Sequence, residues 1–150
     1  MEFEIGYWGL FFACFLAATI IPFSSEATLS AVILAGYHPV TSLIVATAGN
    51  WLGGLTSYYL GYLGKLEWIH KYLKITDAKL FKVKNFASGK GLWLSIFCWV
   101  PFVGDIIAVV LGLLKTNFIL TAAGMLIGKA LRYIVWGYLT LQIRDVIISF

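Results

Sequence analysis

The chain consists of long apolar blocks separated by short polar breaks. The blocks neither alternate as a half-buried β-strand does nor show the single apolar stripe of a surface helix. Blocks of this kind are typical of helices in hydrocarbon, because crossing a core of about 30 Å takes roughly 20 apolar residues. They cover residues 5–21, 27–35, 40–63, 92–100, 106–114 and 118–143. The pattern predicts an all-α integral membrane protein.

Only blocks 40–63 and 118–143 are clearly long enough to span the core. Three others have about nine residues each, or roughly 14 Å of helix, which is half of the core: 27–35, 92–100 and 106–114. We expect them to be half-helices that enter the membrane, turn near its middle and leave again. Block 5–21 is expected to be one arm of such a loop, with a full crossing as the alternative.

The same arrangement occurs twice, at an offset of 79 residues. Four pairs of positions share this offset: Pro22 and Pro101, Glu26 and Asp105, Gly49 and Gly128, and Tyr59 and Tyr138. Apolar segments interrupted at corresponding positions of two halves indicate a transporter-type site at the repeat interface. Because one span separates the two loops, the loops should enter from opposite sides, so the repeats are inverted. We predict one domain, 1–150, with repeat A at about 5–64 and repeat B at about 92–143.

Two pairs of glycines lie four residues apart on the predicted spans. They are Gly49 with Gly53 and Gly124 with Gly128. Small residues at this spacing let helix backbones approach closely. We expect both pairs to serve packing within the chain.

The polar stretch 65–91 lies between the repeats and holds seven lysines against Glu67 and Asp77. The positive-inside rule places it in the cytoplasm, with both termini on the opposite side. Its apolar residues follow helical spacing, which predicts a pair of amphipathic interfacial helices, the second capped by Thr76. The lysines indicate an anchor on anionic headgroups, and recognition of a particular lipid is the alternative.

Composition supports this class of protein. Of the 150 residues, 61% are hydrophobic and 12% are charged, against about 25% charged in soluble domains. The net charge of +4 comes from the lysine-rich stretch and indicates a membrane surface as partner, not nucleic acid. Cys14 and Cys98 lie in apolar blocks without metal-ligand spacing. Hydrolase and nucleotide-binding motifs are absent from the sequence, so we expect no enzyme activity, metal or cofactor.

Glu26 and Asp105 are the strongest candidates for function, because an ionised acid at mid-membrane costs about 2.5 to 3.5 kcal/mol. We predict that they carry transport and proton coupling. The alternative is a capping role, in which Asp105, Ser24 or Ser25 accepts hydrogen bonds from free amides of the half-helices. The turns themselves are assigned to Pro22, Pro101 and Gly104.

Lys129 and Arg132 lie near the middle of the last span and share one helical face. With the two acids they could form a closed, charge-paired cluster. They could instead bind an anionic headgroup together with the half-helix N-termini. The equivalent positions in repeat A are Asn50 and Gly53. A cavity between the repeats would therefore be basic on one wall only, the wall that carries Lys129 and Arg132. The predicted substrate-binding residues are Lys129, Arg132, Asn50, Ser24 and Ser25.

Four segments carry a family resemblance: IIPFSSEATLSAVILAG, GNWLGGLTSYYLG, WVPFVGD and GKALRY. In order and spacing they resemble the YqaA-like branch of the DedA superfamily, also called VTT or SNARE-associated, over about residues 10–138. The resemblance implies two facing re-entrant loops and an activity in lipid translocation. It also implies proton or sodium coupling in some members. Bacterial relatives are linked to membrane homeostasis and undecaprenyl-phosphate recycling, and eukaryotic ones to phospholipid scrambling.

Carried over to this sequence, the first-loop acid is Glu26, and the second-loop proline and acid are Pro101 and Asp105. The larger DedA branch has arginines three residues before and after that proline. This chain has Cys98 and Gly104 there. Whether Lys129 and Arg132 replace those arginines is a question that the sequence leaves open.

The sequence therefore predicts a transporter that moves an anionic lipid between leaflets, either a polyprenyl phosphate or a phospholipid, with proton coupling as an option. A small-solute or ion transporter using the same carboxylates is one alternative, and a non-transporting membrane scaffold is another. The expected partners are membrane lipids, and a homo-oligomer is compatible with the sequence. The expected location is the bacterial inner membrane.

Overall fold

The computed structural model describes residues 2–19, 24–64, 67, 70–71, 76–87, 90–100 and 103–149, and every regular element in these ranges is a helix. The elements are α1 (Glu2–Ala17), α2 (Ser25–Leu34), α3 (Pro39–Tyr62), α5 (Asp77–Ala87), α6 (Gly91–Ile96), the 3₁₀ turn η1 (Phe97–Trp99), α7 (Val103–Leu113) and α8 (Phe118–Ile148). The prediction of an all-α chain is confirmed.

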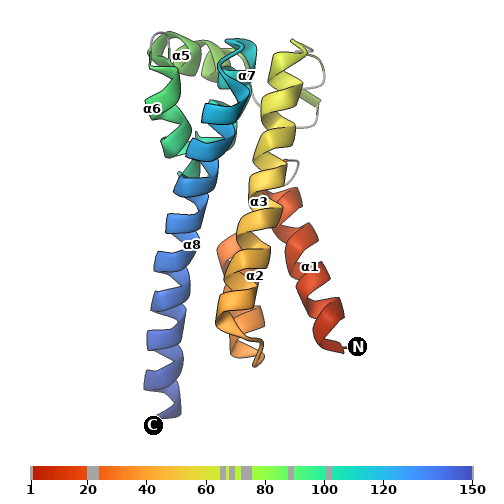
Figure 1. The fold of residues 1–150 in the computed structure, drawn as a ribbon, viewed down its shortest axis with the longest axis vertical. Coiled ribbons are helices and arrows are strands. Elements are labelled where there is room, and N and C mark those ends of the chain that lie inside the picture. Colours follow the sequence, from red (N-terminus) through yellow and green to blue (C-terminus); the bar gives the residue numbers. More distant parts are fainter. Residues whose placement is uncertain are drawn as a thin grey trace.

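The first half of the chain turns back at mid-length before it runs the full length of the molecule. Helix α1 leads from the N-terminal end to mid-length, α2 returns toward that end, and α3 then runs to the end that carries α5 (Figure 1). Ser24 caps α2, because its side chain accepts a hydrogen bond from the Ala27 amide at 3.2 Å. Pro39 begins α3, where its missing N–H costs no hydrogen bond. Gly36, with φ at 95°, makes the turn between α2 and α3.

The second half follows the same path from the opposite end. Helices α6 and η1 run from the α5 end to mid-length, α7 returns, and α8 runs the whole way to the C-terminus (Figure 1). Asn117 caps α8 by accepting hydrogen bonds from two amides of its first turn. The short helices predicted at 27–35, 92–100 and 106–114 correspond to α2, to α6 with η1, and to α7. Both termini lie at one end of the molecule and α5 lies at the other.

Among the described helices, α8 is the one with both the length and the apolar composition needed to cross a membrane. Its 31 residues extend about 46 Å at 1.5 Å per residue. Helix α3 has 24 residues, which is also long enough. Its glycines, serines and threonines, together with Asn50, lower its hydropathy, and it does not meet the apolar composition that α8 meets. The full crossing by residues 40–63 therefore stays a prediction.

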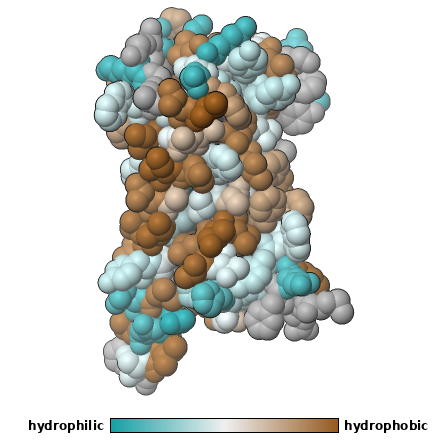
Figure 2. All heavy atoms as spheres, in the orientation of Figure 1, coloured by the Kyte–Doolittle hydropathy of each residue, from teal (hydrophilic) through white to brown (hydrophobic). Residues whose placement is uncertain are grey.

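The outer surface is apolar around the middle of the molecule. Figure 2 shows hydrophobic residues over the central part of one face, with hydrophilic residues gathered toward both ends. Many large side chains point outward, and Ile119 is 75% exposed and Ile127 54% exposed. A water-soluble domain of this size rarely exposes so wide an apolar surface. The surface is suited to a hydrocarbon environment.

Glycines bring the helices of each half into backbone contact. A Cβ atom on Gly49 would overlap the backbone carbonyl of Phe11 in α1, and one on Gly128 would overlap that of Ile96 in α6. The predicted packing role of the two glycine pairs is thereby confirmed. Only glycine allows helices to approach this closely.

The described part of the segment between the halves is centred on α5. This helix begins directly after Thr76, where the sequence placed a cap. It buries Leu80 and exposes Phe81, as an amphipathic helix should. Most of the first predicted linker helix lies outside the described residues.

Gly61 provides a test of the backbone contacts. A Cβ atom there would overlap the carbonyl group of Val109, so Gly61→Ala should destabilise the fold by about 1–3 kcal/mol, the usual cost of overpacking. The matched control is Gly9→Ala, because nothing lies within 4 Å of a Cβ at Gly9 and alanine favours a helix. Thermal unfolding in detergent should show a lower midpoint for Gly61→Ala alone. Equal midpoints for the two variants would contradict the packing.

Candidate functional site

Four charged side chains gather at mid-length, where the short helices begin. Glu26 lies in the first turn of α2 and Asp105 in the first turn of α7. Lys129 and Arg132 lie in the middle of α8. The structure therefore brings together the two predicted acids and the two predicted bases. Each acid also lies at a helix N-terminus, where the helix dipole favours negative charge.

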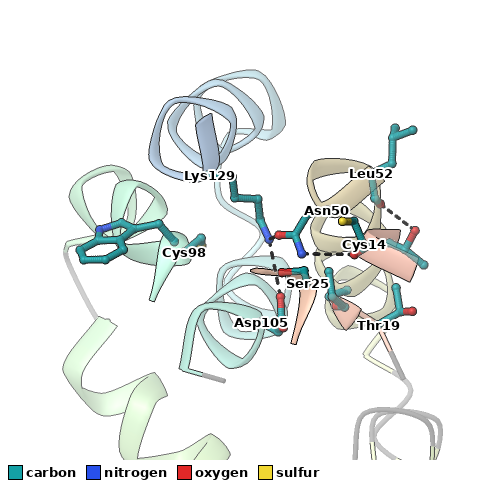
Figure 3. A network of polar contacts seen from close by, with 12 residues as sticks. Cys14, Thr19, Ser25, Asn50, Leu52, Cys98, Asp105 and Lys129 are labelled. Atoms are coloured by element: carbon teal, nitrogen blue, oxygen red, sulfur yellow. Dashed lines mark hydrogen bonds and ion pairs between the residues drawn. The ribbon is translucent and has the colours of Figure 1, made fainter. Parts of the chain in front are cut away.

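Lys129 is the most deeply buried charge of this group, with 2% of its surface exposed. Its ammonium donates a hydrogen bond to the side-chain oxygen of Asn50 on α3 and lies 3.8 Å from the carboxylate of Asp105 on α7. Figure 3 shows the lysine pointing at both partners. The Asn50 amide donates in turn to the backbone carbonyl of Cys14 at 3.2 Å. These contacts connect four helices through polar groups, of which Lys129 and Asn50 are buried.

Asn50 and Lys129 are 79 residues apart, which is the offset between the two predicted repeats. Equivalent positions of the two halves therefore touch each other in the interior. Nearby, a Cβ on Gly54 would meet the side chains of Met125 and Lys129. This glycine leaves the room that the lysine needs beside α3.

Arg132 forms the second ion pair of the site, with the carboxylate of Glu26. It also donates a hydrogen bond to the backbone carbonyl of Trp99 in η1 at 3.0 Å. The hydroxyls of Ser24 and Ser25 lie 3.4 Å from the other carboxylate oxygen of Glu26. The side chains of Arg132 and Glu26 are 14% and 15% exposed. This pair is thus more accessible than Lys129.

Further polar contacts extend from this pair along α2 and α8. The hydroxyl of the fully buried Tyr133 donates to Ser25 at 2.7 Å. Ser30 accepts a hydrogen bond from the Trp136 indole at 2.9 Å and lies 2.9 Å from the Thr140 hydroxyl. Sequence reasoning missed Tyr133, Ser30, Trp136 and Thr140. The available signal was their helical spacing from Glu26 and Lys129, since residues three or four apart share a face.

Gly104 has a steric role at the start of α7. It is buried, and a Cβ there would overlap the backbone carbonyl of Cys98. Its amide donates to the Val100 carbonyl at 2.8 Å. Gly104 therefore lets α7 begin directly against η1. The other two predicted turn residues, Pro22 and Pro101, lie outside the described residues.

Taken together, each base of the site is paired with an acid in this conformation. The closed cluster that the sequence left open as an alternative is the arrangement seen here. Within the described residues, no three His, Cys, Asp or Glu side chains gather in a way that could hold a metal ion. The side chains of the site can pair charges, form hydrogen bonds and bind protons.

Comparison with known proteins finds relatives over most of the chain. The inner membrane protein YqaA of Escherichia coli is 31% identical over 143 residues, covering 95% of this chain and 96% of the relative. The protein of the same name from Shigella flexneri has the same identity and coverage. An uncharacterized protein of Haemophilus influenzae is 28% identical over 139 residues, covering 87% of this chain and 85% of the relative.

No family model and no solved structure matches the chain. The similarity to YqaA extends nearly from end to end of both proteins and includes the segments that hold the four charges. The chain therefore belongs to the YqaA-like branch of the DedA family of inner membrane proteins.

Proposed function

We propose that this protein moves an anionic lipid between the leaflets of the inner membrane. The observation that carries the proposal is the four-charge site of Glu26, Asp105, Lys129 and Arg132, enclosed at mid-length of a molecule with an apolar exterior. Charged groups at such depth are expensive in a bilayer and usually mark a transport pathway. A polyprenyl phosphate or a phospholipid has the anionic headgroup that two bases would attract.

The path of the chain supports this proposal. Helices α1 and α2 turn back at mid-length from one end, and α6, η1 and α7 do so from the other (Figure 1). In a membrane these segments would be re-entrant loops of two inverted repeats, with their acids meeting near the midplane. The contact between the equivalent residues Asn50 and Lys129 is what a two-fold axis between the repeats would produce.

In the proposed mechanism, a phosphate group replaces a carboxylate as the partner of Arg132. The planar guanidinium can hold two phosphate oxygens at once. The N-termini of α2 and α7, where the helix dipole favours an anion, add to this attraction. Protonation of Glu26 would release Arg132 for the phosphate, and deprotonation would expel it. Asp105 would act on Lys129 in the same way.

A scaffold without transport is a second candidate. The complete pairing of the two bases with the two acids favours it, because a neutral, hydrogen-bonded cluster can serve stability or packing alone. The scaffold and transporter proposals differ in what happens when a charge is removed without loss of the fold.

Leaflet exchange in proteoliposomes tests the proposed function directly. Fluorescent lipids with an anionic phosphate headgroup, a zwitterionic headgroup or an uncharged headgroup would be placed in both leaflets. The label in the outer leaflet would then be quenched chemically. We expect the anionic lipid of the inner leaflet to reach the quencher faster in vesicles that contain the purified protein than in protein-free vesicles. Equal rates for every headgroup, with and without protein, would leave the scaffold as the better description.

Glu26→Gln should abolish this exchange while leaving the protein folded. Glutamine keeps the size of the side chain and an acceptor oxygen for Arg132, but it cannot take up and release a proton. The control is Glu67→Gln, because Glu67 is exposed and lies outside the site. Unchanged exchange and unchanged pH dependence in Glu26→Gln would disprove the carrier role of this residue.

Topology provides an independent prediction. Single cysteines at Ser149 and Lys82, in a background with Cys14→Ala and Cys98→Ala, should react with a membrane-impermeant reagent from opposite sides. The positive-inside rule places Lys82 in the cytoplasm. If the reagent reached both positions from the same side, the inverted arrangement would be wrong.

A further inference from the structure

Besides the contact between the long helices α3 and α8, two seams join the halves of the molecule, and in the predicted repeats they are equivalent. We define the α2–α8 seam as the contact between these two helices and the α3–α7 seam as the contact between those two. Each pairs the second short helix of one half with the long helix of the other half. They differ in their polar contacts.

The α3–α7 seam is apolar and closed by glycine. A Cβ on Gly61 would overlap the Val109 carbonyl, and one on Gly112 would overlap the Tyr58 carbonyl. On α7, five consecutive residues from Ile107 to Leu111 are at most 5% exposed. Backbones in direct contact leave no polar side chain that a ligand could replace. We therefore expect this seam to stay closed.

Polar contacts run along the α2–α8 seam from mid-length as far as Ser30 and Thr140. Its contacts are Glu26 with Arg132, Ser25 with Tyr133, Ser30 with Trp136 and Ser30 with Thr140. From Arg132 to Thr140 the α8 residues extend about 12 Å along the helix. Interhelical hydrogen bonds are one of the forces that hold membrane helices together, and in this pair of equivalent seams they are gathered on the α2–α8 side.

The same seam reaches the outer surface. Trp136 is 41% exposed, while the Arg132 and Glu26 side chains are partly exposed. Tyr133 and Ser25 form the buried side of the seam. A molecule in the surrounding lipid could therefore reach the polar groups if α2 and α8 separated.

We propose that the α2–α8 seam is the binding path of a lipid phosphate headgroup between the four-charge site and the end of the molecule that carries both termini. The inference rests on the proposed function and assigns the route to it. The acyl chains stay in the bilayer while the headgroup passes between the helices. Each of the four contacts named above joins hydrogen-bonding groups. The phosphate oxygens accept bonds from Arg132, Tyr133, Trp136 and the serine hydroxyls in place of their present partners.

Cysteine accessibility tests the opening of the seam without relying on transport. Ser25 and Ser57 are both buried serines with one hydrogen-bonded partner on another segment, Tyr133 and Ala18 respectively. Only Ser25 lies in the seam. In the background with Cys14→Ala and Cys98→Ala, an anionic, membrane-impermeant thiosulfonate should label Ser25→Cys from the side of the termini and leave Ser57→Cys unlabelled. Failure to label Ser25→Cys would overturn the proposal.

Protection from labelling identifies the ligand. Dihexanoyl phosphatidic acid should slow the labelling of Ser25→Cys, whereas dihexanoylglycerol, which has the same chains but no phosphate, should not. Protection by dihexanoylglycerol, or by inorganic phosphate alone at the same concentration, would overturn the assignment to a lipid headgroup.

A disulfide across the seam tests its use in transport. The Ser30 and Thr140 hydroxyls are 2.9 Å apart, so Ser30→Cys with Thr140→Cys should crosslink α2 to α8. Thr116→Cys with Thr121→Cys is the matched control, because those hydroxyls are 3.0 Å apart and lie outside the seam. Oxidation should stop lipid exchange in the first variant, reduction should restore it, and the control should be insensitive. Equal exchange by the oxidised and reduced seam variant would overturn the proposal.

Failure of the proposed route and failure of the proposed function give different results. If the protein exchanges lipid but the seam neither labels nor responds to the crosslink, the route is wrong and the proposed function stands. If Ser25→Cys labels and phosphatidic acid protects it while no lipid is exchanged, the seam is a lipid-phosphate site and the transport function is wrong.

Discussion

The buried ammonium of Lys129 is the constraint on which the arrangement of the helices depends. A charge with 2% exposure in an apolar protein must be paired and hydrogen-bonded, or burying it becomes prohibitive. Its two partners come from different helices, Asn50 from α3 and Asp105 from α7. Satisfying this one group therefore fixes the rotation of α8 about its axis. That rotation in turn directs Arg132 toward Glu26 and Tyr133 toward Ser25.

Close packing and polar pairing are distributed unequally around this centre. Glycines bring α3 and α7 into backbone contact on one side, while hydroxyls, an indole and an ion pair separate α2 from α8 on the other. Dispersion forces at a glycine contact fall steeply with small displacements. Polar pairs can exchange one partner for another of similar chemistry. The fold thus combines one seam in backbone contact with one seam held by polar pairs.

Much of this fold could be predicted from the sequence. The length of each apolar block indicates the length of its helix, and the breaks at matching positions indicate the two repeats. The half-helices at 27–35 and 106–114 correspond to α2 and α7, and the charges were visible as exceptions in apolar blocks. The pairing of Arg132 with Glu26 was not predictable, since it depends on the rotation of α8. Tyr133 and Ser30 were missed because single hydroxyl residues are common in membrane helices and show their partners only after the helices pack.

The contact between Asn50 and Lys129 also limits how the two halves can differ. If each half were a separate chain pairing with its own copy, the same side chain would face itself at this position. Two lysines there would repel each other in a medium that screens charge weakly. Two copies of the first half would instead leave Glu26 without a cation, because Asn50 and Gly53 stand where the second half has Lys129 and Arg132. Joining the halves in one chain permits a lysine on one side and its neutral partner on the other. The covalent link thus allows an asymmetric interior that a symmetric pair of half-length chains could not stabilise.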